Sequence, residues 1–152
     1  MMPGRVRAGA LGAMLMLTVL AAGCGDSPTA PTATLQTETF TGTLSPLGLS
    51  SHGFSVQYGY AYSDASVTVT RLVTVSDGSE RQISVGVGFG TVNVGSCTRA
   101  AALTNATAPY NVELPTNGSP FVAGPYCIAI FDNTDAPTVT EPLTYTMVVK
   151  HY

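Results

Sequence analysis

The 152-residue sequence contains no tryptophan, a single lysine, two histidines and only 10% charged residues. So low a charge content excludes an ordinary disordered protein. Arg5 and Arg7 lie in the first 23 residues, so four of the six basic side chains and all nine acidic ones follow them. This acidic balance argues against a nucleic-acid partner. The 16 glycines and 10 prolines, together with frequent Thr and Val, favour strands joined by turns.

The N-terminus has the pattern of an export signal. Residues 1–7 carry two arginines and no acid, and a 15-residue apolar run extends from Ala8 to Ala22. A helix of this length spans about 22 Å, which is short of the roughly 30 Å hydrocarbon layer of a bilayer. The pattern therefore predicts a secretory signal peptide over residues 1–23.

The signal ends in Leu20-Ala21-Ala22-Gly23-Cys24, which resembles the lipobox of bacterial lipoproteins. In that family the Cys accepts a diacylglyceryl group, and cleavage before it leaves an acylated N-terminus. The family prefers Leu at the position of Ala21. The resemblance implies that lipid on Cys24, palmitate among its acyl chains, anchors the chain to a membrane. The protein would then lie in the bacterial cell envelope, on its periplasmic or surface side. The alternatives are an ordinary signal with a chance cysteine, or an uncleaved anchor helix.

Residues 24–38 are rich in Ser, Thr and Pro and lack apolar periodicity. They are predicted to form an extended tether between the lipid and a domain over residues 39–152.

Cys97 and Cys127 remain as one pair if Cys24 carries a lipid. In an exported, oxidising context such a pair predicts a disulfide, which would close a loop of about 30 residues. The alternative is a pair of thiols or metal ligands. Because no third and fourth ligands follow at a metal-like spacing, the disulfide is favoured.

Alternation of apolar and polar residues dominates the chain after the tether, and outside the signal no stretch has a helical period over ten or more residues. The predicted fold is all-β, an antiparallel β-sandwich of jelly-roll or immunoglobulin-like type with about eight short strands. The predicted strands are Phe40–Thr43, Ser51–Gln57, Ala65–Val73, Gln82–Phe89, Cys97–Leu103, Tyr110–Leu114, Tyr126–Phe131 and Leu143–Lys150.

The run Gln82–Phe89 places Val85, Val87 and other apolar residues on one face and glycines, among them Gly86 and Gly88, on the other. Glycine along a whole strand face predicts that another strand or a large side chain lies close against it.

Several of these alternating runs resemble the bacterial pre-peptidase C-terminal domain. Its first strands are similar to Phe40–Leu44, His52–Val56 and Val67–Val69, and its later strands to Gly124–Ile128 and Tyr145–Val149. The resemblance implies a jelly-roll-like sandwich that is usually a non-catalytic appendage of secreted hydrolases and sometimes assists substrate contact. In this sequence a signal and a tether precede the domain in place of a peptidase, and a cysteine pair is added.

Neither histidine is assigned a catalytic role. His52 shares a strand face with Phe54 and Val56, which predicts a packed or edge histidine, and His151 is expected to fray at the chain end. No serine lies in a Gly-x-Ser-x-Gly elbow. We therefore expect no catalytic residue, no cofactor and no enzyme activity, with a hydrolase as the least favoured reading.

The segment Asp132, Asn133 and Asp135 could present three oxygen ligands to Ca²⁺ from a loop after a strand. Asp and Asn are also ordinary turn residues, because their side chains bond to the local backbone. The segment is a weak calcium candidate, and no metal site is otherwise predicted.

Tyr58, Tyr60 and Tyr62 alternate and would share one face of an extended chain. Such a row could stack on sugar rings or contact a protein, or it could pack over a sandwich edge. The predicted function is a non-catalytic binding or structural role at the cell envelope, with an envelope protein or glycan as partner. The alternative is a carbohydrate- or matrix-binding module that uses this tyrosine face.

Overall fold

The structure is a computed structural model that describes residues 34–57, 65–116 and 121–152. The signal peptide, Cys24, most of the tether and Tyr58, Tyr60 and Tyr62 lie outside the described residues, so the expectations placed on them stay predictions. In the parts of the chain that are described, we find no helix with the length and apolarity needed to cross a bilayer.

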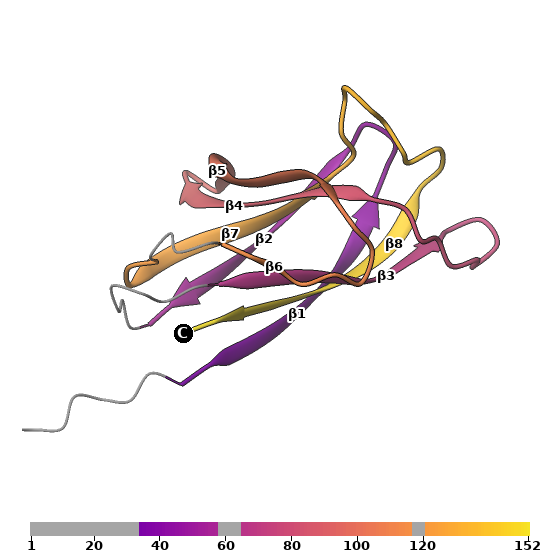
Figure 1. Cartoon of the computed structure of the whole chain (residues 1–152). Coiled ribbons are helices and arrows are strands. Elements are labelled where there is room, and N and C mark those ends of the chain that lie inside the picture. Colours follow the sequence, from indigo (N-terminus) through magenta and orange to yellow (C-terminus); the bar gives the residue numbers. More distant parts are fainter. Residues whose placement is uncertain (1–33, 58–64, 117–120) are drawn as a thin grey trace, which may run out of the picture. The chain divides into compact units, whose positions relative to one another are not determined.

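The described chain forms two antiparallel sheets of four strands, and the predicted all-β sandwich is confirmed (Figure 1). One sheet, here the β8 sheet, has the order β1-β8-β3-β6, and the other, the β7 sheet, has the order β2-β7-β4-β5. The strands are β1 (Gln36–Leu44), β2 (Leu49–Val56), β3 (Ser66–Thr74), β4 (Val85–Asn93), β5 (Ser96–Ala108), β6 (Leu114–Pro115), β7 (Gly124–Phe131) and β8 (Leu143–His151).

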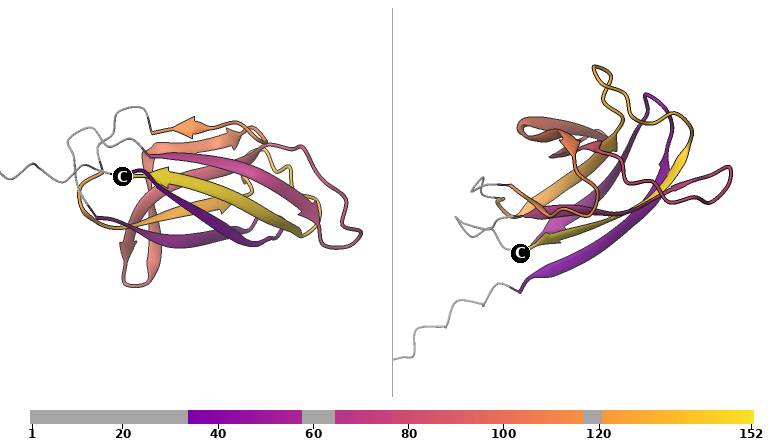
Figure 2. Two further views of the ribbon diagram at one scale, coloured as in Figure 1. Left: turned by 90° about the horizontal axis from the view of Figure 1, so that it is seen from below. Right: turned by 45° about the vertical axis from the view of Figure 1, so that its right-hand side comes forward.

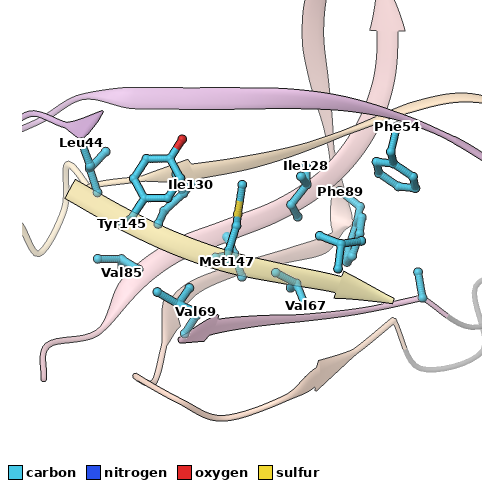
Figure 3. Close-up of a cluster of buried hydrophobic side chains, with 14 of the residues drawn as sticks. Leu44, Phe54, Val67, Val69, Val85, Phe89, Ile128, Ile130, Tyr145 and Met147 are labelled. Carbon is cyan, nitrogen blue, oxygen red and sulfur yellow. The ribbon is translucent and has the colours of Figure 1, made fainter. Parts of the chain in front are cut away.

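The core lies between the two sheets and is built by alternation. Along β8, Tyr145, Met147 and Val149 are buried and alternate with less buried residues, because successive side chains of a strand point to opposite faces. Figure 3 shows Tyr145 and Met147 facing the β7 side chains Ile128 and Ile130 across the sandwich. The alternation that is visible in the sequence therefore determines which residues of each strand face the core and stabilise the fold by burial.

The predicted strand Tyr110–Leu114 is wrong over most of its length, because only Leu114–Pro115 pairs, with β3. Asn111 has a left-handed φ of 56°, which ends the extended conformation. Its N–H donates to the carbonyl of Val69 at 2.8 Å, and the Tyr110 hydroxyl donates to the carbonyl of Thr70 at 3.1 Å. The segment is a loop held against β3.

The β4–β5 hairpin is irregular. Gly90 pairs with Arg99 but Gly88 pairs with Thr104, so β5 contains extra residues between these two pairs. Extra residues in one strand of an antiparallel pair bend it and increase its twist. Figure 2 shows that the end of this hairpin turns away from the direction of the neighbouring strands. The bend brings the first part of β5 over the outer face of its own sheet.

Candidate functional site

Along β4, the residues that face the outside of the β7 sheet are the glycines Gly86, Gly88 and Gly90. A Cβ atom built on Gly86 would lie 2.2 Å from the Phe131 ring, and one on Gly90 would lie 2.0 Å from the backbone oxygen of Thr98. Both distances are far inside van der Waals contact, so a Cβ atom at Gly90 would collide with backbone and one at Gly86 would displace the Phe131 ring. The predicted close approach to the glycine face is confirmed: an aromatic ring covers one end and the bent β5 backbone covers the other.

Phe131 lies between this glycine floor and an arginine. The guanidinium carbon of Arg99 is 4.0 Å from the centre of the Phe131 ring. A guanidinium over an aromatic face is attracted by the negative charge of the π-system. The ring therefore holds the charged end of Arg99 on the outer face of the sheet.

The Cys97–Cys127 disulfide is confirmed, with the two Cα atoms 5.7 Å apart. It joins the beginning of β5 to the middle of β7, and Gly90 is the residue of β4 that pairs with Cys127. The covalent bond fixes the bent part of β5 against the sheet, close to Arg99.

Asp132 holds the opposite end of this face. Its side chain is buried, and its two carboxylate oxygens accept three backbone N–H bonds: Oδ2 from Leu47 at 3.0 Å, and Oδ1 from Thr138 at 2.9 Å and Val139 at 3.3 Å. Its own N–H donates to the carbonyl of Gly48 at 3.0 Å. One buried carboxylate thus joins the β1–β2 loop to the loop that follows β7. The three backbone N–H groups that donate to it compensate for the loss of water around its charge.

The other two calcium candidates, Asn133 and Asp135, form a turn of their own. The side-chain oxygen of Asn133 accepts the N–H of Asp135 at 3.1 Å, an Asx turn. Over the described part of the chain, no three His, Cys, Asp or Glu side chains are grouped so that they could hold a metal ion. The calcium site stays a weak prediction, and the contacts that we observe are those of a turn.

Together these features enclose a shallow groove of about 850 Å³ on the outer face of the β7 sheet, which we call the outer groove. Its lining includes Leu49, Thr98, Arg99, Thr104, Phe131 and Asn133. The groove is lined by one cation, an aromatic edge, several hydroxyl and amide groups and the Asp132 carboxylate, whose oxygens accept backbone N–H groups. The cation and the polar groups suit a polar ligand that carries a negative charge.

His52 lies on the other face of the same sheet, towards the core. Its ring stacks on Phe40 with centroids 4.9 Å apart, and its Nε2 is 2.7 Å from the Tyr145 hydroxyl oxygen. Tyr145 in turn donates to Ser50 Oγ at 2.6 Å. Desolvation by burial lowers the pKa of His52 below 6.5 and raises the pKa of Tyr145 above 10.0. The prediction of a packed histidine is confirmed.

The expectation that His151 frays is wrong. His151 is buried, its Nε2 lies 2.9 Å from Glu38 Oε1, and its ring packs on Phe54 with centroids 4.9 Å apart. The strand continues to His151, which pairs with Gln36 of β1. Position near a terminus does not cause fraying when the strand is paired and its side chain is covered.

The sequence matches no protein-family model, and it matches no curated protein. The inference of function therefore rests on the residues of the groove and on the N-terminal pattern.

Sequence reasoning missed Arg99 and Phe131. The glycine face predicted a large side chain over β4, but it did not identify which one, because that depends on the pairing of Gly86 with Phe131. For Arg99 the sequence holds no signal, since the irregular register of β5 decides where its side chain lies.

Proposed function

We propose that this chain is a non-catalytic binding protein of the bacterial cell envelope, anchored by lipid on Cys24 and binding its ligand in the outer groove. The observation that carries the proposal is the Arg99 guanidinium. It lies over Phe131, and among the described residues the ion pairs are Arg81–Glu141, Lys150–Glu113 and His151–Glu38, none of which involves Arg99. A ligand carboxylate can therefore accept hydrogen bonds from this guanidinium without displacing a protein partner.

The groove is also built on rigid parts of the molecule. The disulfide fixes the bent end of β5, and Asp132 fixes the two loops at the opposite end. Neither device lies in the apolar core that stabilises the sandwich. A preformed surface of this kind loses little conformational entropy when a ligand binds, which favours affinity.

The chemistry of the lining favours a cell-wall glycan that carries carboxylates. Thr98, Thr104 and Asn133 supply hydroxyl and amide groups that suit sugar hydroxyls, Leu49 supplies apolar contact, and Arg99 supplies the charge. A lipid anchor followed by a tether would hold the groove near such a polymer. A protein ligand is the other outcome that the test distinguishes.

Co-sedimentation of the full-length protein with purified peptidoglycan sacculi tests this proposal. Arg99→Ala is expected to weaken retention by about tenfold or more, since a hydrogen bond to a charged group contributes about 1.5–3 kcal/mol. The matched control is Arg71→Ala, which removes an exposed arginine near Thr41 and Thr144, away from the groove. Equal retention of the two variants, or no retention of the unchanged protein, would contradict glycan binding in the groove.

The tyrosine alternative is tested in the same assay. If Tyr58, Tyr60 and Tyr62 form the ligand face, their combined replacement by Ala abolishes retention while Arg99→Ala leaves it intact. If the outer groove is the site, the two results are reversed.

The anchor is tested separately from the ligand. Metabolic labelling with a palmitate analogue is expected to mark the unchanged protein and not Cys24→Ala. Labelling of Cys24→Ala would contradict the anchor and leave the groove unaffected.

The contacts of the two imidazoles support a non-catalytic role. His52 is engaged by Tyr145 and His151 by Glu38, and in the described segments neither is hydrogen-bonded to a serine or cysteine side chain that it could activate. His52→Ala is therefore expected to change stability without affecting retention on sacculi.

A further inference from the structure

The edge strands of the two sheets are β1 and β6 in the β8 sheet and β2 and β5 in the β7 sheet. They differ in how well they are protected against pairing with another chain. On one side, β6 has only two residues and includes Pro115, and β5 changes register against β4. Short length, proline and irregular register are features by which natural edge strands avoid adding a further strand. The β5–β6 side is therefore protected.

On the other side, β1 has none of these features. It is nine residues long and pairs with β8 without a register shift, from Gln36 opposite His151 to Leu44 opposite Leu143. It contains no lysine, arginine or proline, and in the described chain it is the last strand of its sheet. A long, regular edge strand of this kind is a template for a further strand, because one row of its backbone N–H and C=O groups faces outward.

The sequence of β1 is nearly symmetric about its centre. It reads Thr37-Glu38-Thr39-Phe40-Thr41-Gly42-Thr43, and the threonines at 37, 39, 41 and 43 are exposed. If two copies of β1 pair antiparallel about Phe40, Thr39 lies opposite Thr41 of the second copy, and Thr37 lies opposite Thr43. Thr–Thr pairs stabilise neighbouring strands, and the one charge, Glu38, meets Gly42 instead of a second Glu38.

The charge on β1 is also satisfied within its own sheet, since Glu38 Oε1 lies 2.9 Å from His151 Nε2. The edge strand of the β7 sheet on this side, β2, is different. It has eight residues, and a symmetric pairing about His52 would place unlike residues opposite each other, such as Leu49 and Ser55. The symmetry required for self-pairing therefore belongs to β1.

From these observations we infer that two copies of this domain associate through antiparallel pairing of β1 with β1. The pairing joins two four-stranded β8 sheets into one continuous sheet across a two-fold axis. A contact of one strand pair buries less surface than a standard interface, so the dimer is weak in dilute solution. It becomes stronger when both copies are held on one membrane, a step that rests on the proposed lipid anchor.

Cysteine cross-linking of the full-length protein in lipid vesicles tests the pairing. Thr39→Cys and Thr41→Cys are mixed in equal amounts and oxidised, and the bridged peptides are identified by mass spectrometry. We expect about tenfold more bridged dimer than in a mixture of Thr41→Cys with Thr144→Cys, because residues directly opposite have Cβ atoms about 5 Å apart. Thr144 is exposed on the same sheet but lies on β8, away from the edge. Equal yields in both mixtures, or no bridge in either, would overturn the inference.

A second variant separates edge pairing from random collision. Thr39→Lys with Thr41→Lys brings two lysines opposite each other, which protects an edge, whereas Thr144→Lys with Thr146→Lys adds the same charge to the middle of the sheet. In the protein with Thr39→Lys and Thr41→Lys, the yield of bridges between Thr37→Cys and Thr43→Cys is expected to fall to that of the control mixture. In the protein with Thr144→Lys and Thr146→Lys, the yield is expected to persist. Persistence in both backgrounds would contradict the pairing. Retention on sacculi is expected to be unchanged in both, so this result is independent of ligand binding in the outer groove. The vesicle experiment rests on the proposed lipid anchor, which the palmitate labelling of Cys24 tests separately.

Discussion

The two sheets present outer faces of opposite character. On the β8 sheet, threonines of β1 lie opposite threonines of β8 without a register shift, as in the pairs Thr41–Thr146 and Thr43–Thr144, and this part of the surface is polar. On the β7 sheet, glycines leave room for the Phe131 ring, Arg99 and a disulfide, and the surface is hollowed. Both sheets contribute alternate residues to one core. The core therefore constrains only the inward-facing residues of each strand, and the outward-facing residues of the two sheets can differ in function.

The disulfide gives the largest expected difference between the two faces. Replacing Cys97 and Cys127 by Ala opens the covalent link across a sequence separation of 30 residues, which is expected to cost about 3–4 kcal/mol in the chain-entropy description. For a domain of this size the melting temperature is expected to fall by more than about 10 °C, measured by circular dichroism. Thr41→Ala with Thr146→Ala, two truncations on the opposite face, serves as the control and is expected to change the melting temperature little. Equal losses in the two proteins would remove the distinction between the faces.

Asp132 gives the next largest effect. Asp132→Ala leaves the backbone N–H groups of Leu47, Thr138 and Val139 without their acceptor, and we expect a loss of about 2–3 kcal/mol in the free energy of unfolding. Urea denaturation measures the loss. Asp132→Asn, which keeps one acceptor oxygen, is expected to lose less. If Asp132→Ala unfolds at the same urea concentration as the unchanged protein, the carboxylate does not hold the groove wall.

Two glycines of the β7 sheet, one closely covered and one not, test whether close packing over β4 requires glycine. Gly90→Ala forces a Cβ atom into the backbone at Thr98, where the available distance is 2.0 Å, and is expected to destabilise the domain by about 1–3 kcal/mol. Gly53→Ala meets its nearest atom, the Tyr126 carbonyl oxygen, at 3.8 Å. It is expected to be neutral or to stabilise slightly, because alanine loses less entropy in a strand. Thermal unfolding of both variants checks the difference, and similar behaviour would contradict the covered floor of the groove.

The sandwich itself was predictable because alternation is local. The spacing of apolar residues alone predicts which side chains point inward, as for Val67 and Val69 on β3 and Tyr145 and Met147 on β8. The disulfide was predictable from cysteine count and expected compartment. These features need no knowledge of which strand lies beside which.

The groove depends on that knowledge. Arg99 reaches Phe131 only because β5 gains residues against β4 and bends, and His151 is fixed by Glu38, which lies 113 positions away in the chain. Pairings between distant strands and the register of an irregular hairpin are tertiary properties. A periodic pattern in one segment cannot encode them, and for this reason the sequence alone predicts fraying at His151 from its position and does not show its contact with Glu38.

The smallest expected effect lies in the turn after β3, at the end of the β8 sheet. Hydrogen bonds donated by the Thr74 hydroxyl and by Ser79 lower the pKa of Asp77 from 3.8 to about 2. The folded state therefore favours the ionised carboxylate. Its contribution to stability is complete above about pH 3.8 and is lost as the pH falls through about 2. Asp77→Asn is expected to flatten the dependence of stability on pH within this window.

Urea midpoints measured across that pH range check the effect, with Thr74→Ser as the control that keeps the donating hydroxyl and hence the pH dependence. Because the turn belongs to the β8 sheet, the titration of Asp77 followed by NMR is expected to be the same in Gly53→Ala and in the unchanged protein. A shift in the Asp77 pKa when only the β7 sheet is altered would mean that the two sheets do not act as separate surfaces over one core. In that case Arg99→Ala and changes on β1 would have to be interpreted together, and the independence of groove and edge would be lost.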